Sequence, residues 1–341
     1  MKYVTLGKSG LKVSQVGFGG IPIASVSFEE AERCIRTSLD LGINFIDTAR
    51  AYKDSEEKIG RALKNLKSER ENLVIATKAI PKSLPEVIHS LEESLRRLHT
   101  DYIDLLQMHN AADQAKLDRS LEILEGLLPL KEEGKIRHIG VSVHGVEWAN
   151  RVIETDAFET IMIAMNFIVR EPVDVILPVA REHNTGVIVM KPMAGGEITN
   201  PRLAFKFFLE MDDVAPIVGI KSPEEIREIM KIIEDGTPPT KEEKEEMDRI
   251  RRETGNVFCR RCGYCEPCPQ GVDIVSINVF PSIIKRYPPL YMLQQGMDKS
   301  LKSYEKCIKC GECEEKCPYR LHIREMMEKS YRTYLEITGA R

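Results

Sequence analysis

Short runs of apolar, mostly β-branched residues alternate with amphipathic stretches from Gln15 to about Asp235. Such runs between polar turns predict strands, whereas apolar positions three and four residues apart predict helices. The expected strands are Gln15–Gly19, Ile43–Asp47, Leu73–Lys78, Tyr102–His109, Ile136–Ser142, Thr160–Met165, Gly186–Met190 and Ala215–Gly219. Between them lie expected helices such as Phe28–Leu41, Pro85–Leu98, Ser120–Glu133 and Pro223–Ile233.

Eight strands in regular alternation with helices predict an α/β fold, a closed (β/α)8 TIM barrel whose reactive side chains lie at the C-terminal strand ends. A doubly wound sheet is the alternative, but no G-x-G-x-x-G turn follows any expected strand. Lys2–Thr5 and Leu11–Val13, joined by a turn with two glycines, predict a hairpin ahead of the barrel.

The proline-rich segment 236–240 ends this alternation. Thr240, with Glu243 three residues later, predicts the start of a very polar helix that runs to about Glu253. Helical periodicity returns from Ile323 to about Ile337. The expected organisation is therefore a barrel over 1–236, a linker with the polar helix over 237–257, and a small, mainly helical, cysteine-rich domain over 258–341.

Composition excludes some classes of protein. The chain has 341 residues, 42% of them apolar and 30% charged, which is typical of a globular protein. A net charge of −4 gives no reason to expect nucleic acid or an anionic membrane as a partner. No apolar run approaches the roughly 20 residues that would span a bilayer. Met1-Lys2-Tyr3 does not open a secretory signal peptide.

Eight of the nine cysteines lie between 259 and 317, in two runs with the spacing of iron–sulfur ligands. In each run three cysteines stand three residues apart, and a fourth is followed by proline. This pattern predicts 4Fe-4S clusters, which carry single electrons. The ligands are Cys259, Cys262, Cys265 and Cys268 in the first run and Cys307, Cys310, Cys313 and Cys317 in the second.

By analogy with two-cluster ferredoxins, Cys317 completes the cluster of the first run and Cys268 that of the second. The first run has only two residues before its last cysteine, so one cluster with four spare cysteines is an alternative. Zinc is another alternative, but a third cysteine at the same spacing has no place in a tetrahedral site. Cysteines kept as thiolates indicate the reducing cytoplasm rather than disulfides.

Four complementary polar residues stand at the ends of consecutive expected strands. Asp47, Lys78 and His109 end three of them, and Tyr52 follows Asp47 by five residues. A tyrosine can protonate a carbonyl oxygen if a lysine ammonium makes its phenol more acidic. An aspartate would hold that lysine charged, and a histidine would orient the carbonyl. Taken singly, each of these residues also has a purely structural explanation, such as capping a loop, covering the surface or forming an ordinary buried hydrogen bond.

These residues lie in segments that together resemble the aldo-keto reductase family, in the branch with a C-terminal ferredoxin-like domain. The segments are 42–52, 55–64, 75–78, 101–109, 134–142 and 218–224, with the first cysteine run and Gln270–Ile274. The resemblance implies the barrel, a nicotinamide cofactor (NADP or NAD), a small carbonyl substrate, and a catalytic tetrad of Asp47, Tyr52, Lys78 and His109.

The resemblance also implies a set of cofactor-binding residues: Gly19, Gly20, Ser142, Asn166, Lys191, Gly219, Lys221, Ser222, Glu225 and Glu228. Val143, Met162 and Met190 replace two amides and an aromatic ring expected in the family. Glu225 replaces an arginine or glutamine, and a carboxylate suits a ribose hydroxyl better than a 2′-phosphate. We therefore expect NADH to be accepted at least as well as NADPH, unless Glu225 is only a solvated helix residue.

The leading hypothesis is an NAD(P)H-dependent reductase of aldehydes or ketones, with clusters that pass electrons on or stabilise the tail. The alternative is an electron-transfer module that docks to another redox protein, with the barrel as a scaffold. A nicotinamide moves two electrons and a cluster one, so exchange between them needs a flavin, bound here or on a partner protein, or a substrate that tolerates a radical. The sequence shows no flavin motif.

Overall fold

The computed structural model describes residues 2–64, 67–111, 113–255, 257–285 and 287–339. The chain folds into two compact units. The first comprises residues 1–192 and 200–240, and the second residues 193–199 and 241–341. The expected domain ranges also include residues 1, 65–66, 112, 256, 286 and 340–341, which lie outside the described residues.

The first unit is a closed barrel of eight parallel strands in chain order, in which β10 pairs with β3 to complete the circle. This confirms the predicted (β/α)8 barrel and shows that the doubly wound alternative is wrong. The strands are β3 (Gly17–Gly19), β4 (Phe45–Asp47), β5 (Val74–Ala79), β6 (Ile103–His109), β7 (Ile136–Val143), β8 (Thr160–Ala164), β9 (Gly186–Met190) and β10 (Val214–Gly219).

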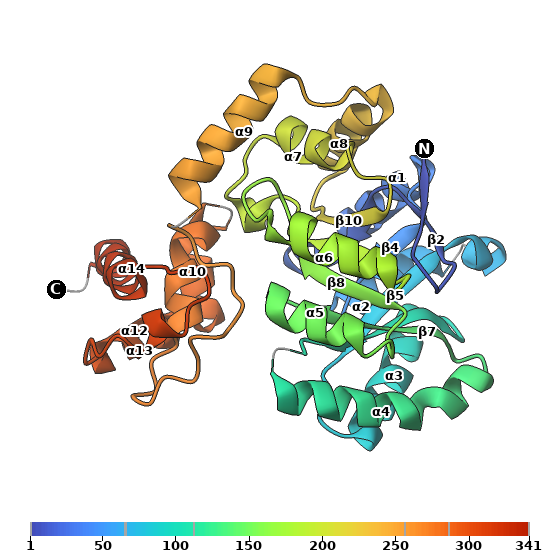
Figure 1. The fold of residues 1–341 in the computed structure, drawn as a ribbon, viewed down its shortest axis with the longest axis horizontal. Coiled ribbons are helices and arrows are strands. Elements are labelled where there is room, and N and C mark those ends of the chain that lie inside the picture. The colour runs from blue at the N-terminus through green and yellow to red at the C-terminus, as the bar shows by residue number, and fades with distance from the viewer. Residues whose placement is uncertain (1, 65–66, 112, 256, 286, 340–341) are drawn as a thin grey trace. The chain divides into compact units, whose positions relative to one another are not determined.

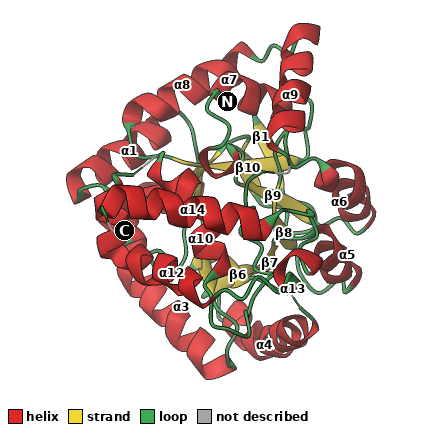
Figure 2. Cartoon of the chain, turned by 90° about the vertical axis from the view of Figure 1, so that its left-hand side faces the viewer, coloured by secondary structure: helices red, strands yellow, loops and turns green. Residues whose placement is uncertain are grey.

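Amphipathic helices surround these strands, as Figure 2 shows with the strands in yellow and the helices in red. Local sequence fixes where several of them begin; in α1, for example, Ser27 and Glu30 form a capping box. The helices are α1 (Phe28–Asp40), α2 (Ser55–Leu63), α3 (Leu84–Leu98), α4 (Gln114–Glu132), α5 (Val146–Glu154), α6 (Glu171–Glu182), α7 (Pro201–Phe208) and α8 (Pro223–Asp235), with short 3-10 turns η1 (Pro22–Ser25) and η2 (Lys67–Asn72).

The expected hairpin closes the N-terminal end of the barrel. Strands β1 (Tyr3–Thr5) and β2 (Lys12–Ser14) pair antiparallel. Their buried residues Val4 and Val13 share one core cluster with Phe45 and Val74, the first residues of β4 and β5. Since this end is filled by apolar side chains, the C-terminal strand ends form the rim that can carry chemistry.

The second unit is helical, as expected, and its core mixes apolar residues with cysteines. Helices α10, α12 and α14 pack on one another (Figure 1). Its core includes Ile277, Phe280, Leu301 and Met327. Its elements are η3 (Ala194–Gly196), α9 (Lys241–Thr254), α10 (Ile274–Ile284), α11 (Pro289–Met292), the π-helical turn η4 (Leu293–Met297), α12 (Asp298–Lys302), η5 (Ser303–Lys306), α13 (Glu312–Glu315) and α14 (Ile323–Thr338).

The second unit also includes the predicted polar helix and a segment that follows the barrel strand β9. Helix α9 begins at Lys241, directly after the expected cap residue Thr240. The segment Met193–Thr199, which follows β9, belongs to the second unit, where Glu197 forms an ion pair of 3.0 Å with Lys285. Among the described residues, no helix is both long and apolar enough to cross a membrane.

Candidate active site and cluster domain

The strand register places most of the predicted site residues on one rim of the barrel. Because all eight strands run parallel, their C-terminal ends meet at the same edge. Four of the strands end at predicted residues, which are Gly19, Asp47, His109 and Gly219. Two more predicted residues, Lys78 and Ser142, stand one position before a strand end. A further two, Asn166 and Lys191, follow a strand end. Residues far apart in the chain are thereby brought to one edge.

A buried ion pair forms the centre of this rim. The Lys78 ammonium lies 2.7 Å and 2.6 Å from the two carboxylate oxygens of Asp47, and it also donates to the Thr48 carbonyl at 2.7 Å. The side chains are 1% and 3% exposed. Burial lowers the pKa of Lys78, but Asp47 and Tyr52 outweigh this and hold the pKa above its ordinary value. Lys78 is therefore a fixed positive charge.

Tyr52 lies beside this charge, on the loop between β4 and α2. The Lys78 Nζ atom lies 5.2 Å from the centre of the tyrosine ring. Burial raises the pKa of Tyr52, and Lys78 lowers it by less, so the net pKa is above the ordinary value. Lys78 thus acts on the pKa of Tyr52 in the expected direction, but burial outweighs it. The phenol is protonated at neutral pH and holds a proton that it can donate.

His109 completes the group from the end of β6. Its ring meets that of Tyr52 edge to face, with centroids 6.2 Å apart and an angle of 84°. Burial, and then the charge of Lys78, lower the pKa of His109 to about 4. His109 is therefore neutral at pH 7 and acts as a hydrogen-bond donor or acceptor rather than as a cation. The structure thus brings all four residues of the expected tetrad together.

The sequence reasoning missed two buried polar residues that support this group. Gln107 is fully buried and donates to Asp47 Oδ1 at 3.1 Å. Glu56, in the first turn of α2, accepts from the Thr77 hydroxyl at 2.7 Å. Gln107 pairs in register with Lys78 and stands two residues before His109. The sequence did contain a signal for Gln107. It is a polar residue in a buried strand, and it lies on the same face as the candidate catalytic residue His109.

Ser142 and Asn166 are already engaged in the fold's own hydrogen bonds. The Ser142 hydroxyl accepts from the Asn110 amide at 3.0 Å. Asn166 Oδ1 accepts from the amides of Ile168 and Val169, each at 2.9 Å, and Nδ2 donates to the Lys191 carbonyl at 3.0 Å. The amide nitrogen carries a second N–H, so Asn166 keeps one donor for a ligand. This donor suits the carbonyl oxygen of a carboxamide.

The start of α8 carries the residues expected near the adenosine end of the cofactor. Ser222 is its N-cap and accepts from the Glu225 amide at 3.4 Å. The Glu225 carboxylate accepts from the Lys221 amide at 2.8 Å. The Glu225 carboxylate is therefore hydrogen-bonded to the residue before the N-cap and is not simply a solvated group. Lys221 and Glu228 are exposed.

The expected glycines allow close packing at the rim. The Gly20 amide donates to the Asp47 carbonyl at 2.7 Å, and a Cβ at residue 20 would lie 2.7 Å from the Ser55 hydroxyl. A Cβ at Gly219 would lie 2.6 Å from a Pro22 ring atom. A side chain at either position would push the loops after β3 and β10 out of place.

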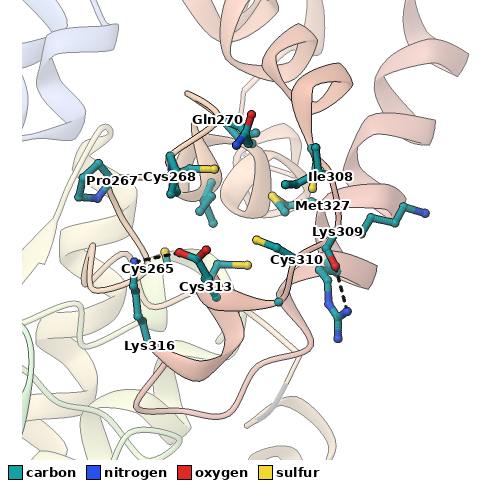
Figure 3. A pocket seen from close by; sticks show the side chains of 17 residues that line it. Cys265, Pro267, Cys268, Gln270, Ile308, Lys309, Cys310, Cys313, Lys316 and Met327 are labelled. Carbon is teal, nitrogen blue, oxygen red and sulfur yellow. Dashed lines mark hydrogen bonds and ion pairs between the residues drawn. The ribbon is translucent and has the colours of Figure 1, made fainter.

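In the second unit, one cavity is lined by cysteines from both runs. Cys268 from the first run lines it with Cys307, Cys310 and Cys313 from the second, and Cys265 lines it as well. Figure 3 shows the sulfur atoms of Cys268, Cys310 and Cys313 around one space. The set expected for the second cluster is thus brought together, and its soft sulfur donors fit iron–sulfur chemistry.

The cysteine geometry differs from that of a single-ion site. Among the described residues, no three His, Cys, Asp or Glu side chains converge on one point as ligands of a single metal ion do. In a zinc site all sulfurs lie about 2.3 Å from one ion. A 4Fe-4S cubane binds each thiolate through a different iron, so its ligands stand farther apart. Zinc and a cubane therefore require different spacings between the sulfur atoms.

The fold and the rim together define a class of protein: a (β/α)8 barrel oxidoreductase with a lysine, tyrosine and histidine site, joined to an iron–sulfur unit. The sequence model of the aldo/keto reductase family matches residues 15–203, more than half of the chain. The chain belongs to the aldo/keto reductase family. A 4Fe-4S dicluster domain matches residues 258–321. This second match favours two clusters over one and goes against zinc.

Known relatives agree with this membership. L-galactose dehydrogenase of Arabidopsis thaliana is 34% identical over 211 residues, which are 57% of this chain and 66% of that protein. An aldo-keto reductase of Bacillus subtilis is 29% identical over 63% of this chain and 68% of that protein. A solved aldo-keto reductase of Bacillus halodurans, in its holo form, has a TM-score of 0.64 and 28% identity over 73% of this chain and 96% of that chain. These matches support an oxidoreductase.

Proposed function

We propose that this protein is an NAD(P)H-dependent oxidoreductase that reduces an aldehyde or ketone to an alcohol, or catalyses the reverse reaction. The observation that carries the proposal is the buried Lys78–Asp47 ion pair beside Tyr52 and His109. A bound nicotinamide would supply the hydride. The clusters of the second unit would exchange single electrons.

In carbonyl reduction, a C–H bond forms at the carbonyl carbon and an O–H bond at its oxygen. The proton comes from the Tyr52 hydroxyl, which leaves a phenolate beside Lys78. Its fixed charge stabilises this phenolate because the site is poorly hydrated. The aspartate keeps the lysine in place and charged. The Lys78 charge stabilises Tyr52 most when the proton is leaving and negative charge develops on its oxygen, so it lowers the energy of the transition state more than that of the bound substrate.

His109 orients the carbonyl group. Because the pKa of His109 is lowered to about 4, its ring is neutral at physiological pH and can donate one N–H to the carbonyl oxygen. A neutral donor polarises the carbonyl without competing with Tyr52 for the proton. Tyr52 is therefore the proton donor and His109 the orienting group.

The cofactor would lie along the rim, held by the residues that the family resemblance implies: Gly19, Gly20, Ser142, Asn166, Lys191, Gly219, Lys221, Ser222, Glu225 and Glu228. Asn166 Nδ2, which donates one N–H to the Lys191 carbonyl, would donate its second N–H to the carboxamide. The Glu225 carboxylate at the start of α8 would repel a 2′-phosphate and suit a ribose hydroxyl. NADH would accordingly be bound at least as well as NADPH.

Two clusters would be held in the second unit. Cys268, Cys307, Cys310 and Cys313 line one cavity and would ligate one cluster. Cys259, Cys262, Cys265 and Cys317 would ligate the other. Thiolate ligands need a reducing compartment, which we propose is the cytoplasm. Exchange between a two-electron carrier and these one-electron centres would require a flavin, bound here or on a partner protein, or a substrate that tolerates a radical.

The Tyr52→Phe variant tests the reductase. It removes the proton donor and keeps the ring, so carbonyl reduction should fall by several orders of magnitude while NADH binding is preserved. The assays are steady-state reduction of a broad carbonyl panel and fluorescence titration with NADH. Full activity of the variant would rule out Tyr52 as the proton donor.

An electron-transfer module with a scaffold barrel is the second candidate. It is favoured by the engagement of Ser142 and Asn166 in internal hydrogen bonds. An inactive wild type across the carbonyl panel, with clusters that dithionite reduces and NADH does not, would support this candidate. Reductase activity in the wild type would exclude it.

A further inference from the structure

The two cysteine runs follow the same backbone course. Arg261 and Lys309, each the residue before the second cysteine of its run, have left-handed φ angles of 59° and 57°. Gly263 and Gly311, each the residue after that cysteine, have φ angles of 82° and 91°. Positions in the first run therefore have structural equivalents in the second. Any difference between equivalent positions distinguishes the two proposed clusters.

The residue after the first cysteine is where the runs differ most. In the first run it is Arg260, which is 8% exposed, and in the second it is Ile308, which is 66% exposed. This is the reverse of the ordinary pattern, since arginine is seldom buried and isoleucine usually is. Arg260 is charged at every physiological pH, so the first run contains a buried positive charge.

Two aromatic rings and a carbonyl hold this charge. The Arg260 guanidinium carbon lies 3.9 Å from the centre of the Tyr319 ring and 5.4 Å from that of Phe258. One of its nitrogens donates to the Gly255 carbonyl at 2.9 Å. Phe258 adjoins Cys259, and Tyr319 follows Cys317 by two residues. The charge is thus held by aromatic residues that lie within two positions of Cys259 and Cys317 in the sequence.

Cys259 and Cys317 are both ligands of the same cluster in the assignment proposed above, on which this inference rests. Reduction adds one negative charge to a cluster, and a fixed positive charge in a poorly hydrated place stabilises that state. The Arg261 amide, which donates to Cys259 Sγ at 3.4 Å, acts in the same direction. We propose that Arg260 raises the reduction potential of the cluster at Cys259, Cys262, Cys265 and Cys317.

The test is a redox titration of the anaerobic full-length protein, with dithionite as reductant and EPR as readout. The Arg260→Met variant removes the charge and keeps an apolar side chain. In this variant we expect the midpoint reduction potential of one cluster to become more negative. At the wild-type midpoint the ratio of reduced to oxidised cluster should fall about tenfold, a shift of about 59 mV for one electron. The second midpoint should stay unchanged, and Arg260→Lys should shift the first by much less.

Arg261→Gln is the matched control, because it removes an exposed positive charge one residue away. Its shift should be much smaller than that of Arg260→Met, and an equal shift would overturn the proposal. Unchanged midpoints in Arg260→Met at wild-type iron content would also overturn it. If that variant loses iron, Arg260→Gln provides the same comparison.

The titration needs neither a nicotinamide nor a carbonyl, so absent reductase activity leaves this inference standing. A wild type without 4Fe-4S signals would instead overturn the cluster assignment, and this inference with it.

Discussion

At the level of single residues, the rim holds opposite charges away from water. Transfer of Lys78 and Asp47 out of water costs several kcal/mol per ion, and their mutual attraction with the added bonds from Gln107 and Thr48 offsets this cost. Such a pair contributes little net stability. The pair instead fixes the positions of both groups, because neither charge can move without leaving the other buried and unpaired.

The Asp47→Asn variant tests this balance. It leaves the Lys78 charge buried without a counter-ion, so the free energy of unfolding should fall by about 3–5 kcal/mol. The double variant Asp47→Asn with Lys78→Met removes both charges and should recover most of that loss, without recovering activity. Urea unfolding of the single and double variants measures both effects. Equal stability of the two variants would contradict this account.

His109 gives stability a pH dependence. The folded ring has a pKa lowered to about 4, against 6.5 for the ordinary side chain, so between these values only the unfolded chain binds the proton. Stability should therefore fall as the pH falls through this window. The fall in urea midpoint from about pH 7 to about pH 5 should be smaller in His109→Gln than in the wild type. His89→Gln, at an exposed histidine, is the control and should behave like the wild type.

At the level of elements, the strand ends and helix starts decide which ligand groups the rim accepts. Glu225 occupies the start of α8, where backbone N–H groups would otherwise face an anion. The helix is capped by Ser222, and the Glu225 carboxylate accepts from the amide of Lys221, the residue before this cap. A helix start with a carboxylate beside it is a poor site for a phosphate, because the two negative charges repel each other.

We expect Glu225→Gln to change cofactor preference. It removes the negative charge and keeps an oxygen that can accept from the Lys221 amide, so NADPH binding should strengthen about tenfold relative to NADH. Dissociation constants for both cofactors measure this. Glu234→Gln, at an exposed glutamate near the other end of α8, should leave the ratio unchanged. A wild type that already prefers NADPH a hundredfold would contradict the argument.

At the level of the whole molecule, the chain consists of two compact units with different sources of stability. The barrel is held by apolar packing around and inside its strands. In the second unit, Cys265, Cys313 and Cys317 are part of the core itself. Cluster binding and folding of this unit should consequently be coupled, as metal binding and folding are in other small domains.

Cys310→Ala tests this coupling. Cys310 is an exposed cysteine that lines the cavity, so its loss should lower the iron content and the stability of the second unit. Unfolding followed by far-UV circular dichroism should show an earlier unfolding transition for the second unit and an unchanged transition for the barrel. Cys34→Ala, at a buried cysteine in α1, should keep its iron and instead destabilise the barrel. Unchanged iron in Cys310→Ala would contradict the ligand assignment.

Patterns between near neighbours in the chain gave correct predictions. The strands of the barrel follow from runs such as Leu73–Lys78, and the structure places β5 at Val74–Ala79. Once the barrel is known, its parallel topology puts Asp47, Lys78 and His109 on one rim. The cysteine spacing likewise indicated iron–sulfur clusters, because loops of fixed length around a cubane require it.

Burial and contacts between distant segments could not be predicted in this way. The net rise in the pKa of Tyr52, the neutral ring of His109 and the bond from Gln107 to Asp47 depend on how completely the rim is closed to water. The same is true of buried Arg260 and exposed Ile308, which occupy equivalent positions. Spacing along the chain determined which residues reach the rim and the cluster loops, whereas the folded surroundings determined their contacts, their burial and hence their charge.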